Sequence, residues 1–112
     1  MTREDIYKNM VKVFQECSDL WLEKNKEYND NDNPFANFDN SAERAGVNRE
    51  KVLLIYMEKQ YGAICKYIRD GSMYSINETV HSRIKDSINF LVMLDAMILV
   101  KEQEENIIKD NE

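Results

Sequence analysis

The stretch VHSRIKDSINFLVMLDAMILV, residues 80–100, decides the fold class. Its apolar side chains recur at steps of three and four residues, at Val80, Ile84, Ile88, Leu91, Leu94, Ile98 and Leu99. That spacing gathers them on one face of an α-helix. Ser75 and Glu78 precede the stretch as an S-x-x-E capping box, a pattern typical of a helix start. We therefore predict a long helix near residues 76–105, followed by a frayed tail at 106–112.

The outer half of this helix, LVMLDAMILV at residues 91–100, is apolar on more than one face. A domain of 112 residues with few helices has too little surface of its own to cover two apolar faces. We therefore expect a homodimer or a higher homo-oligomer, joined in part by this helix.

Two further helices are expected before it. Thr2 can cap a helix near residues 2–27. The apolar face of that helix holds Ile6, Met10, Phe14, Cys17, Leu20 and Trp21. Asn48 can cap another helix near residues 48–69, which begins with the apolar run VLLIYM.

The connections carry turn signals. Asp70-Gly71 ends the second of these helices. A long loop over residues 28–47 holds a short helical turn at Ser41–Ala45, which Gly46 can close. Together these elements predict a single all-α domain, a small antiparallel bundle of three main helices plus a short helical turn, completed by oligomerisation.

Composition excludes several classes of protein. Hydrophobic residues make up 43% of the chain and charged residues 32%, the balance of a soluble globular protein. The net charge of -6 opposes binding to duplex nucleic acid. The sequence contains no run of 18 apolar residues, the length that could span a membrane. The start MTREDIYKNM lacks the apolar core of a signal peptide. Cys17 and Cys65 match no zinc or redox spacing, so we expect a cytoplasmic protein.

A polar stripe runs along the long helix. Its members follow one another at steps of four, four, three and four: Glu78, Ser82, Asp86, Asn89 and Met93. On the second helix, Glu58 directly follows the run VLLIYM. Helices that turn carboxylates inward can build Mg²⁺ sites in a bundle, so Glu58, Glu78 and Asp86 are candidate ligands.

Each of these acids also has a purely structural interpretation. Glu78 can serve only as the acid of the capping box. Asp86 can pair with Arg83 or Lys85 on a solvated face, and Glu58 can pair with a surface lysine. Carboxylates on helices therefore indicate a metal site only when other features support it.

The stretch KNKEYNDNDNPFANFDN, residues 24–40, contains more than a connector needs. A connector requires turn-forming residues, but this one also carries Lys24, Lys26, Tyr28, Phe35 and Phe38. The two phenylalanines can simply anchor a long loop to the core.

The order of these features resembles a known family. The motifs are Lys24-Asn25-Lys26-Glu27-Tyr28, then Glu58-Lys59, then Glu78 followed by Asp86 and Asn89-Phe90. They resemble those of the phage nucleotide-modification-associated proteins, which are similar to the MazG-like all-α nucleoside triphosphate pyrophosphohydrolases. The resemblance covers roughly residues 20–98.

This resemblance implies a chemistry for each motif. Glu58, Glu78 and Asp86 would be the catalytic carboxylates and would hold Mg²⁺ against a triphosphate. The residues implied in substrate binding are Lys24, Lys26, Tyr28, Lys59, Asn89, Phe35 and Phe38, with Trp21 as a further candidate to stack on the base. Because the chain would come from a phage, its compartment would be the cytoplasm of the host cell.

The chain departs from the pattern of these relatives in its acids. Where the active superfamily carries ExxE followed by ExxD, this sequence offers only Glu58, Glu78 and Asp86. Two hypotheses therefore stand side by side. One is a Mg²⁺-dependent (deoxy)nucleoside triphosphate pyrophosphohydrolase, and the other is a non-catalytic helical phage protein that binds a nucleotide or a host protein.

Overall fold

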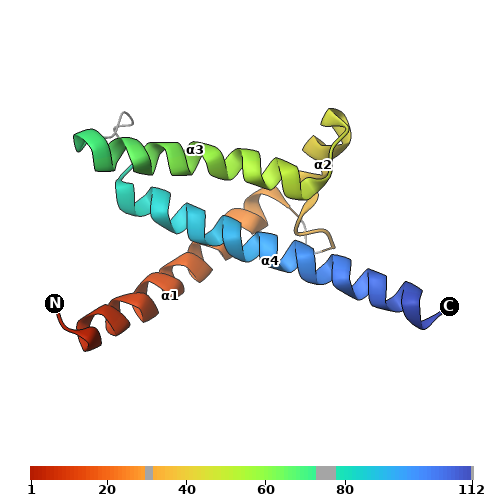
Figure 1. The fold of residues 1–112 in the computed structure, drawn as a ribbon, viewed down its shortest axis with the longest axis horizontal. Coiled ribbons are helices and arrows are strands. Elements are labelled where there is room, and N and C mark those ends of the chain that lie inside the picture. Colours follow the sequence, from red (N-terminus) through yellow and green to blue (C-terminus); the bar gives the residue numbers. More distant parts are fainter. Residues whose placement is uncertain (30–31, 73–77, 112) are drawn as a thin grey trace.

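The fold is built from helices alone over the residues that the computed structural model describes, which are 1–29, 32–72 and 78–111. The helices are α1 (Arg3–Tyr28), α2 (Ala36–Ala45), α3 (Arg49–Asp70) and α4 (Val80–Asp110) (Figure 1). The predicted all-α class is confirmed. Within the same ranges, no helix combines the length and apolar character needed to cross a membrane.

Most of the helix ends marked in the sequence form as predicted. The hydroxyl of Thr2 accepts a 3.1 Å hydrogen bond from the backbone N–H of Asp5, whose carboxylate accepts one of 2.9 Å from the backbone of Thr2. Asn48 caps α3 by accepting a 2.9 Å bond from the backbone N–H three residues later. Gly46 and Gly71 end α2 and α3 with φ of 68° and 72°, a left-handed conformation that glycine adopts without steric cost.

The start of α4 differs from the prediction. Thr79 is the N-cap: its hydroxyl accepts a 3.1 Å bond from the backbone of Ser82, whose hydroxyl accepts a 3.2 Å bond from the backbone of Thr79. Glu78 lies before the helix and forms an ion pair with Arg83, so its predicted role as the capping acid is wrong. The other half of that predicted box, Ser75, lies outside the described residues.

The α2 helix is longer than the predicted turn at Ser41–Ala45, and it fills much of the predicted loop over 28–47. Two of its side chains, Phe38 and Ala42, are buried one turn apart. A ten-residue helix is marginal in water by itself. Burial of this apolar edge is therefore what sustains it.

The buried core lies between α2, α3 and α4. It consists of Phe38 and Ala42 from α2, Val52 and Leu53 from α3, and Met93 and Met97 from α4. Leu53 and Met97 are completely inaccessible to solvent. Partly buried side chains that pack around this core are Trp21, Phe35, Phe90 and Leu94. Because α3 and α4 run side by side in opposite directions (Figure 1), the core extends along their seam.

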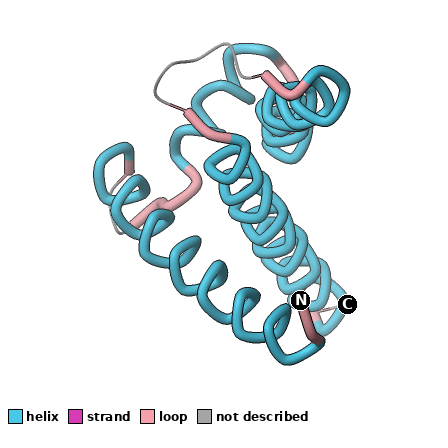
Figure 2. The backbone as a smooth tube through the Cα atoms, turned by 90° about the vertical axis from the view of Figure 1, so that its left-hand side faces the viewer, coloured by secondary structure: helices cyan, strands magenta, loops and turns pink. Residues whose placement is uncertain are grey.

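Two helix ends project beyond this core (Figures 1 and 2). The first half of α1, which precedes its crossing with α4, extends away from α4. At the other end, α4 continues to Asp110, past the predicted end at residue 105, so most of the tail predicted to fray is helical. The radius of gyration is consequently 16.9 Å, compared with about 13 Å expected for a compact domain of this length.

Candidate functional site

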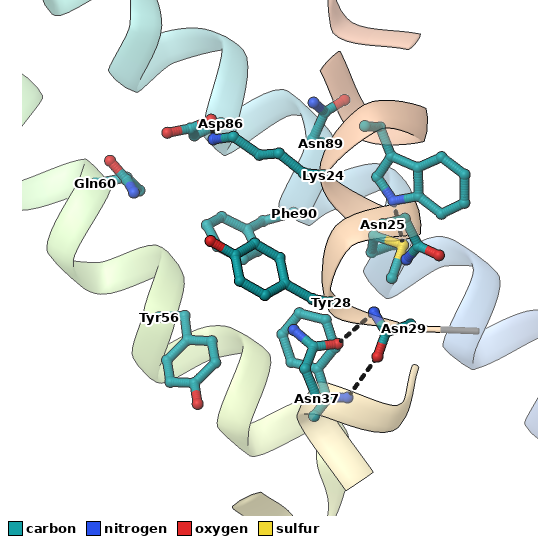
Figure 3. Close-up of a pocket in the computed structure, with 13 residues that line it drawn as sticks. Lys24, Asn25, Tyr28, Asn29, Asn37, Tyr56, Gln60, Asp86, Asn89 and Phe90 are labelled. Atoms are coloured by element: carbon teal, nitrogen blue, oxygen red, sulfur yellow. Dashed lines mark hydrogen bonds and ion pairs between the residues drawn. The ribbon is translucent and has the colours of Figure 1, made fainter. Parts of the chain in front are cut away.

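A pocket of about 230 Å³ lies where the C-terminal end of α1 meets the other three helices (Figure 3). Trp21, Lys24, Asn25, Tyr28 and Asn29 line it from the end of α1, and Asn37 and Phe38 from α2. Tyr56 and Gln60 complete it from α3, and Asp86, Asn89, Phe90 and Met93 from α4. Every described helix therefore contributes to this one cavity.

Aromatic rings form much of the pocket wall. The ring of Phe38 lies 5.7 Å from that of Tyr56 and 6.4 Å from that of Phe90, the latter nearly edge-on at 78°. Such tilted arrangements are the favourable ones for ring pairs. The indole N–H of Trp21 donates to the sulfur of Met93 at 2.8 Å, which fixes the orientation of this ring. Tyr28 stands at the edge of the pocket and is 68% exposed.

Side-chain amides hold the end of α1 against its neighbours. The side-chain amide of Asn29 donates to the side-chain carbonyl of Asn37 at 3.2 Å and accepts a 2.9 Å bond from the backbone N–H of Asn37. Asn25 donates to the backbone carbonyl of Pro34 at 2.9 Å. Asn89 donates to the backbone carbonyl of Cys17 at 3.1 Å.

These amide bonds use only part of the hydrogen-bonding capacity of the pocket. Within the described residues, the side-chain carbonyls of Asn25 and Asn89 accept no hydrogen bond from the protein. An asparagine carbonyl can accept two. Both residues line the pocket, and the bonds that they donate fix the positions of their amides in its wall.

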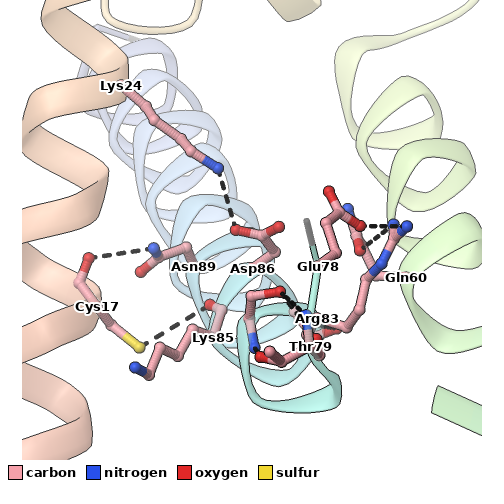
Figure 4. A network of polar contacts seen from close by, with 11 residues as sticks. Cys17, Lys24, Gln60, Glu78, Thr79, Arg83, Lys85, Asp86 and Asn89 are labelled. Carbon is pink, nitrogen blue, oxygen red and sulfur yellow. Dashed lines mark hydrogen bonds and ion pairs between the residues drawn. The ribbon is translucent and has the colours of Figure 1, made fainter. Parts of the chain in front are cut away.

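One ion pair crosses the pocket between α1 and α4. The ammonium of Lys24 lies 3.3 Å from a carboxylate oxygen of Asp86, whose side chain is only 19% exposed (Figure 4). Lys24 itself is 52% exposed, so the energy of this pair is modest because water screens it. The partners that the sequence offered for Asp86 are engaged elsewhere, since Arg83 pairs with Glu78 and Lys85 pairs with Glu16.

The polar contacts next to this pair fasten the middle of α1 to α4. The buried thiol of Cys17 donates to the backbone carbonyl of Lys85 at 3.9 Å (Figure 4). Burial raises the pKa of this thiol, which disfavours the reactive thiolate. The hydrogen bond from Lys85 lowers the pKa of Glu16. Cys17 therefore acts as a packed side chain at the seam, as its apolar surroundings in the sequence indicated.

The pocket gathers six residues that the sequence singled out: Trp21, Lys24, Tyr28, Phe38, Asp86 and Asn89. The remaining candidates lie elsewhere. Lys26 is exposed on α1, and Phe35 packs beneath the guanidinium of Arg49, 4.5 Å from its ring centre. Glu58 and Lys59 are exposed on α3 and do not line the pocket.

The three carboxylates predicted to bind Mg²⁺ are not brought together. Across residues 1–29, 32–72 and 78–111, no group of three His, Cys, Asp or Glu side chains is placed to hold a metal ion. Glu78 forms an ion pair with Arg83, and Asp86 forms one with Lys24. The donor set in the described residues therefore does not fit a resident Mg²⁺ ion.

Helical phase explains why Glu58 misses the pocket. Tyr56 and Gln60 are one turn apart on α3, and both line the cavity. Glu58 is two residues from each of them, which turns it about 200° around the helix axis. The pair Tyr56 and Gln60 was not predicted from the sequence. Its only signal there is a polar residue one turn after a tyrosine, a pattern too common to identify a site.

No protein family, curated protein or solved structure matches this chain. The chemistry of the pocket therefore rests on its own side chains. Rings supply flat apolar walls, fixed amides supply hydrogen-bonding groups, and Lys24 and Asp86 supply one charge of each sign. Such a lining suits a planar molecule with a polar edge.

Proposed function

We propose that this protein binds a nucleotide and that the base occupies the pocket between α1, α2, α3 and α4. The observation that carries the proposal is the lining itself, which combines aromatic rings with the amides of Asn25 and Asn89, fixed by the bonds that they donate. A nucleobase is flat on both faces and carries N–H donors on its edge. Rings stack on the faces of bases, and amide carbonyls accept hydrogen bonds from their edges.

The size of the pocket indicates which part of the nucleotide enters. Its volume of about 230 Å³ is smaller than the ~300–1,000 Å³ typical of pockets that enclose a whole drug-sized ligand. The base fits inside, while the sugar and phosphates extend toward solvent. The exposed ammonium of Lys24 at the edge of the pocket is then the nearest partner for a phosphate.

The family resemblance of the sequence also supports nucleotide binding in this pocket. The resemblance to phage nucleotide-modification-associated proteins assigned substrate contacts to Lys24, Tyr28 and Asn89, and these residues line one pocket. We propose with it a helical bundle of the MazG-like kind that works as a homodimer or higher homo-oligomer in the host cytoplasm. Release of pyrophosphate is not part of this proposal, because the described carboxylates do not form a metal site.

Calorimetry with nucleosides, nucleoside monophosphates and nucleoside triphosphates tests the proposal, each with and without Mg²⁺. We expect binding of at least one nucleotide. Replacing the ring at the pocket edge, Tyr28→Ala, should weaken that binding by about tenfold, the effect of losing one stacking contact. Tyr61→Ala is the matched control, because Tyr61 is 65% exposed on α3, close to the 68% of Tyr28, and does not line the pocket.

Two outcomes would count against nucleotide binding. One is the absence of any heat or thermal stabilisation with every nucleotide at millimolar concentration. The other is an equal loss of affinity in Tyr28→Ala and Tyr61→Ala, which would show that the ligand does not use the pocket. Measuring pyrophosphate in the same samples separates the enzyme hypothesis from the non-catalytic one.

A further inference from the structure

The first half of α1 has an apolar face that the rest of the described chain does not cover. Among the described residues, Glu16 is the first on α1 to form a polar contact with another helix. Ile6, Met10 and Phe14 continue the face on which Cys17 packs, yet they are 49%, 47% and 51% exposed. Figure 1 shows this half of the helix extending away from α4.

That face continues into a groove on α4. Phe14 and Cys17 of α1 and Ile88 and Val92 of α4 line the groove, together with Trp21. Val92 is 62% exposed. Ile6, Met10, Phe14, Ile88 and Val92 together are called the arm face. It forms a continuous apolar surface that runs from the free half of α1 to the middle of α4.

The total surface of the chain shows how much remains to be covered. The solvent-accessible surface is 8792 Å², whereas a compact monomer of 13.3 kDa exposes about 6,500 Å². The excess is about 2,300 Å². A stable dimer buries about 800 Å² of each partner. The excess surface of this chain is therefore more than large enough to form such an interface.

We propose that the arm face is an interface between two copies of this chain related by a two-fold axis. The same patch then serves on both copies, as a two-fold interface requires. Met10 and Phe14 of both copies then lie within the interface.

The interface would also adjoin the candidate ligand site. Trp21 and Asn89 line both the groove and the pocket. A second copy in the groove would therefore support the residues that hold the ligand. This coupling rests on the proposed nucleotide binding, whereas the assembly itself does not.

Light scattering on the full chain over a range of concentrations tests the assembly. We expect twice the chain mass of 13.3 kDa. The double variant Met10→Lys/Phe14→Lys should raise the dissociation constant at least about tenfold, because each copy would bury charge where it buried apolar surface. Ile68→Lys is the control: Ile68 is 77% exposed on α3, outside the arm face, and its substitution should leave the mass unchanged.

A monomeric parent chain at high micromolar concentration would overturn the proposal. So would a dimer that survives the double substitution but dissociates in Ile68→Lys, since the interface would then lie on α3. Circular dichroism verifies that each variant is folded. The two replaced residues are half exposed in the isolated chain, so folding should persist.

Nucleotide affinity, measured on Met10→Lys/Phe14→Lys and Ile68→Lys, reports separately on the ligand site.

Discussion

The two halves of α1 share one apolar periodicity but have different environments. In the second half, Cys17 is buried and Trp21 is partly buried against α4 and the core. In the first half, Ile6 and Met10 occupy equivalent positions on the helix and stay about half exposed. Periodicity therefore shows that a helix has a face to bury, but not what will cover it. The second half of α1 is covered by α4 and the core of its own chain. For the first half, we propose that a second copy of the chain covers it.

The largest expected effect contrasts the core with the free half of α1. Leu53→Ala should lower the free energy of unfolding by about 2–5 kcal/mol, because a fully buried leucine leaves a cavity. Ile6→Ala should change it by less than about 0.5 kcal/mol. Urea unfolding at one protein concentration measures both, in the Met10→Lys/Phe14→Lys background so that assembly does not contribute.

The comparison would fail if Ile6→Ala proved as costly as Leu53→Ala in that background. Such a result would mean that the first half of α1 packs within its own chain.

A smaller effect comes from two matched capping boxes. Thr79→Ala removes the cap of α4, which carries core residues, and should cost about 1 kcal/mol of global stability. Thr2→Ala removes the cap of the free half of α1 and should mainly increase local fraying. Amide exchange distinguishes the two, with faster exchange confined to the first turns of α1 in Thr2→Ala. An equal loss of global stability in both variants would contradict the contrast.

The smallest expected effect is a pH dependence of stability that comes from Glu16, at the junction between the two halves of α1. Glu16 has a lowered pKa because of its hydrogen bond with Lys85. Its stabilising contribution is therefore present above its ordinary pKa of 4.5 and is lost as the pH falls through the lowered folded-state value. Between pH 5 and pH 3, the parent should lose more stability in urea unfolding than Glu16→Gln. Parallel pH profiles would show that the ion pair contributes nothing.

The sequence predicted local features well because local forces determine them. Thr2, Asn48, Gly46 and Gly71 mark helix ends through contacts within a few residues, and all four act as predicted. The length of α2 could not be predicted in this way. It depends on Phe38 packing against rings from α3 and α4, which are distant in the chain.

The sequence predicted candidate residues on α1 and α4 that line the pocket, but it did not predict the lining residues on α3. The polar stripe along α4 placed Asp86 and Asn89 on one face, which the pocket confirms. Whether Glu58 or Gln60 turns toward that face depends on the rotation of α3, which packing fixes and spacing does not. The partner of Asp86 also escaped prediction, because Lys24 reaches it from a helix that crosses α4.

The position of Trp21 gives the molecule an intrinsic optical reporter. It is the only tryptophan in the chain, so fluorescence excited at the red edge of protein absorption comes from one side chain. It lines both the pocket and the groove of the arm face, and its N–H donates to the sulfur of Met93. Emission from this single indole therefore responds to the polarity of both places, without any attached label.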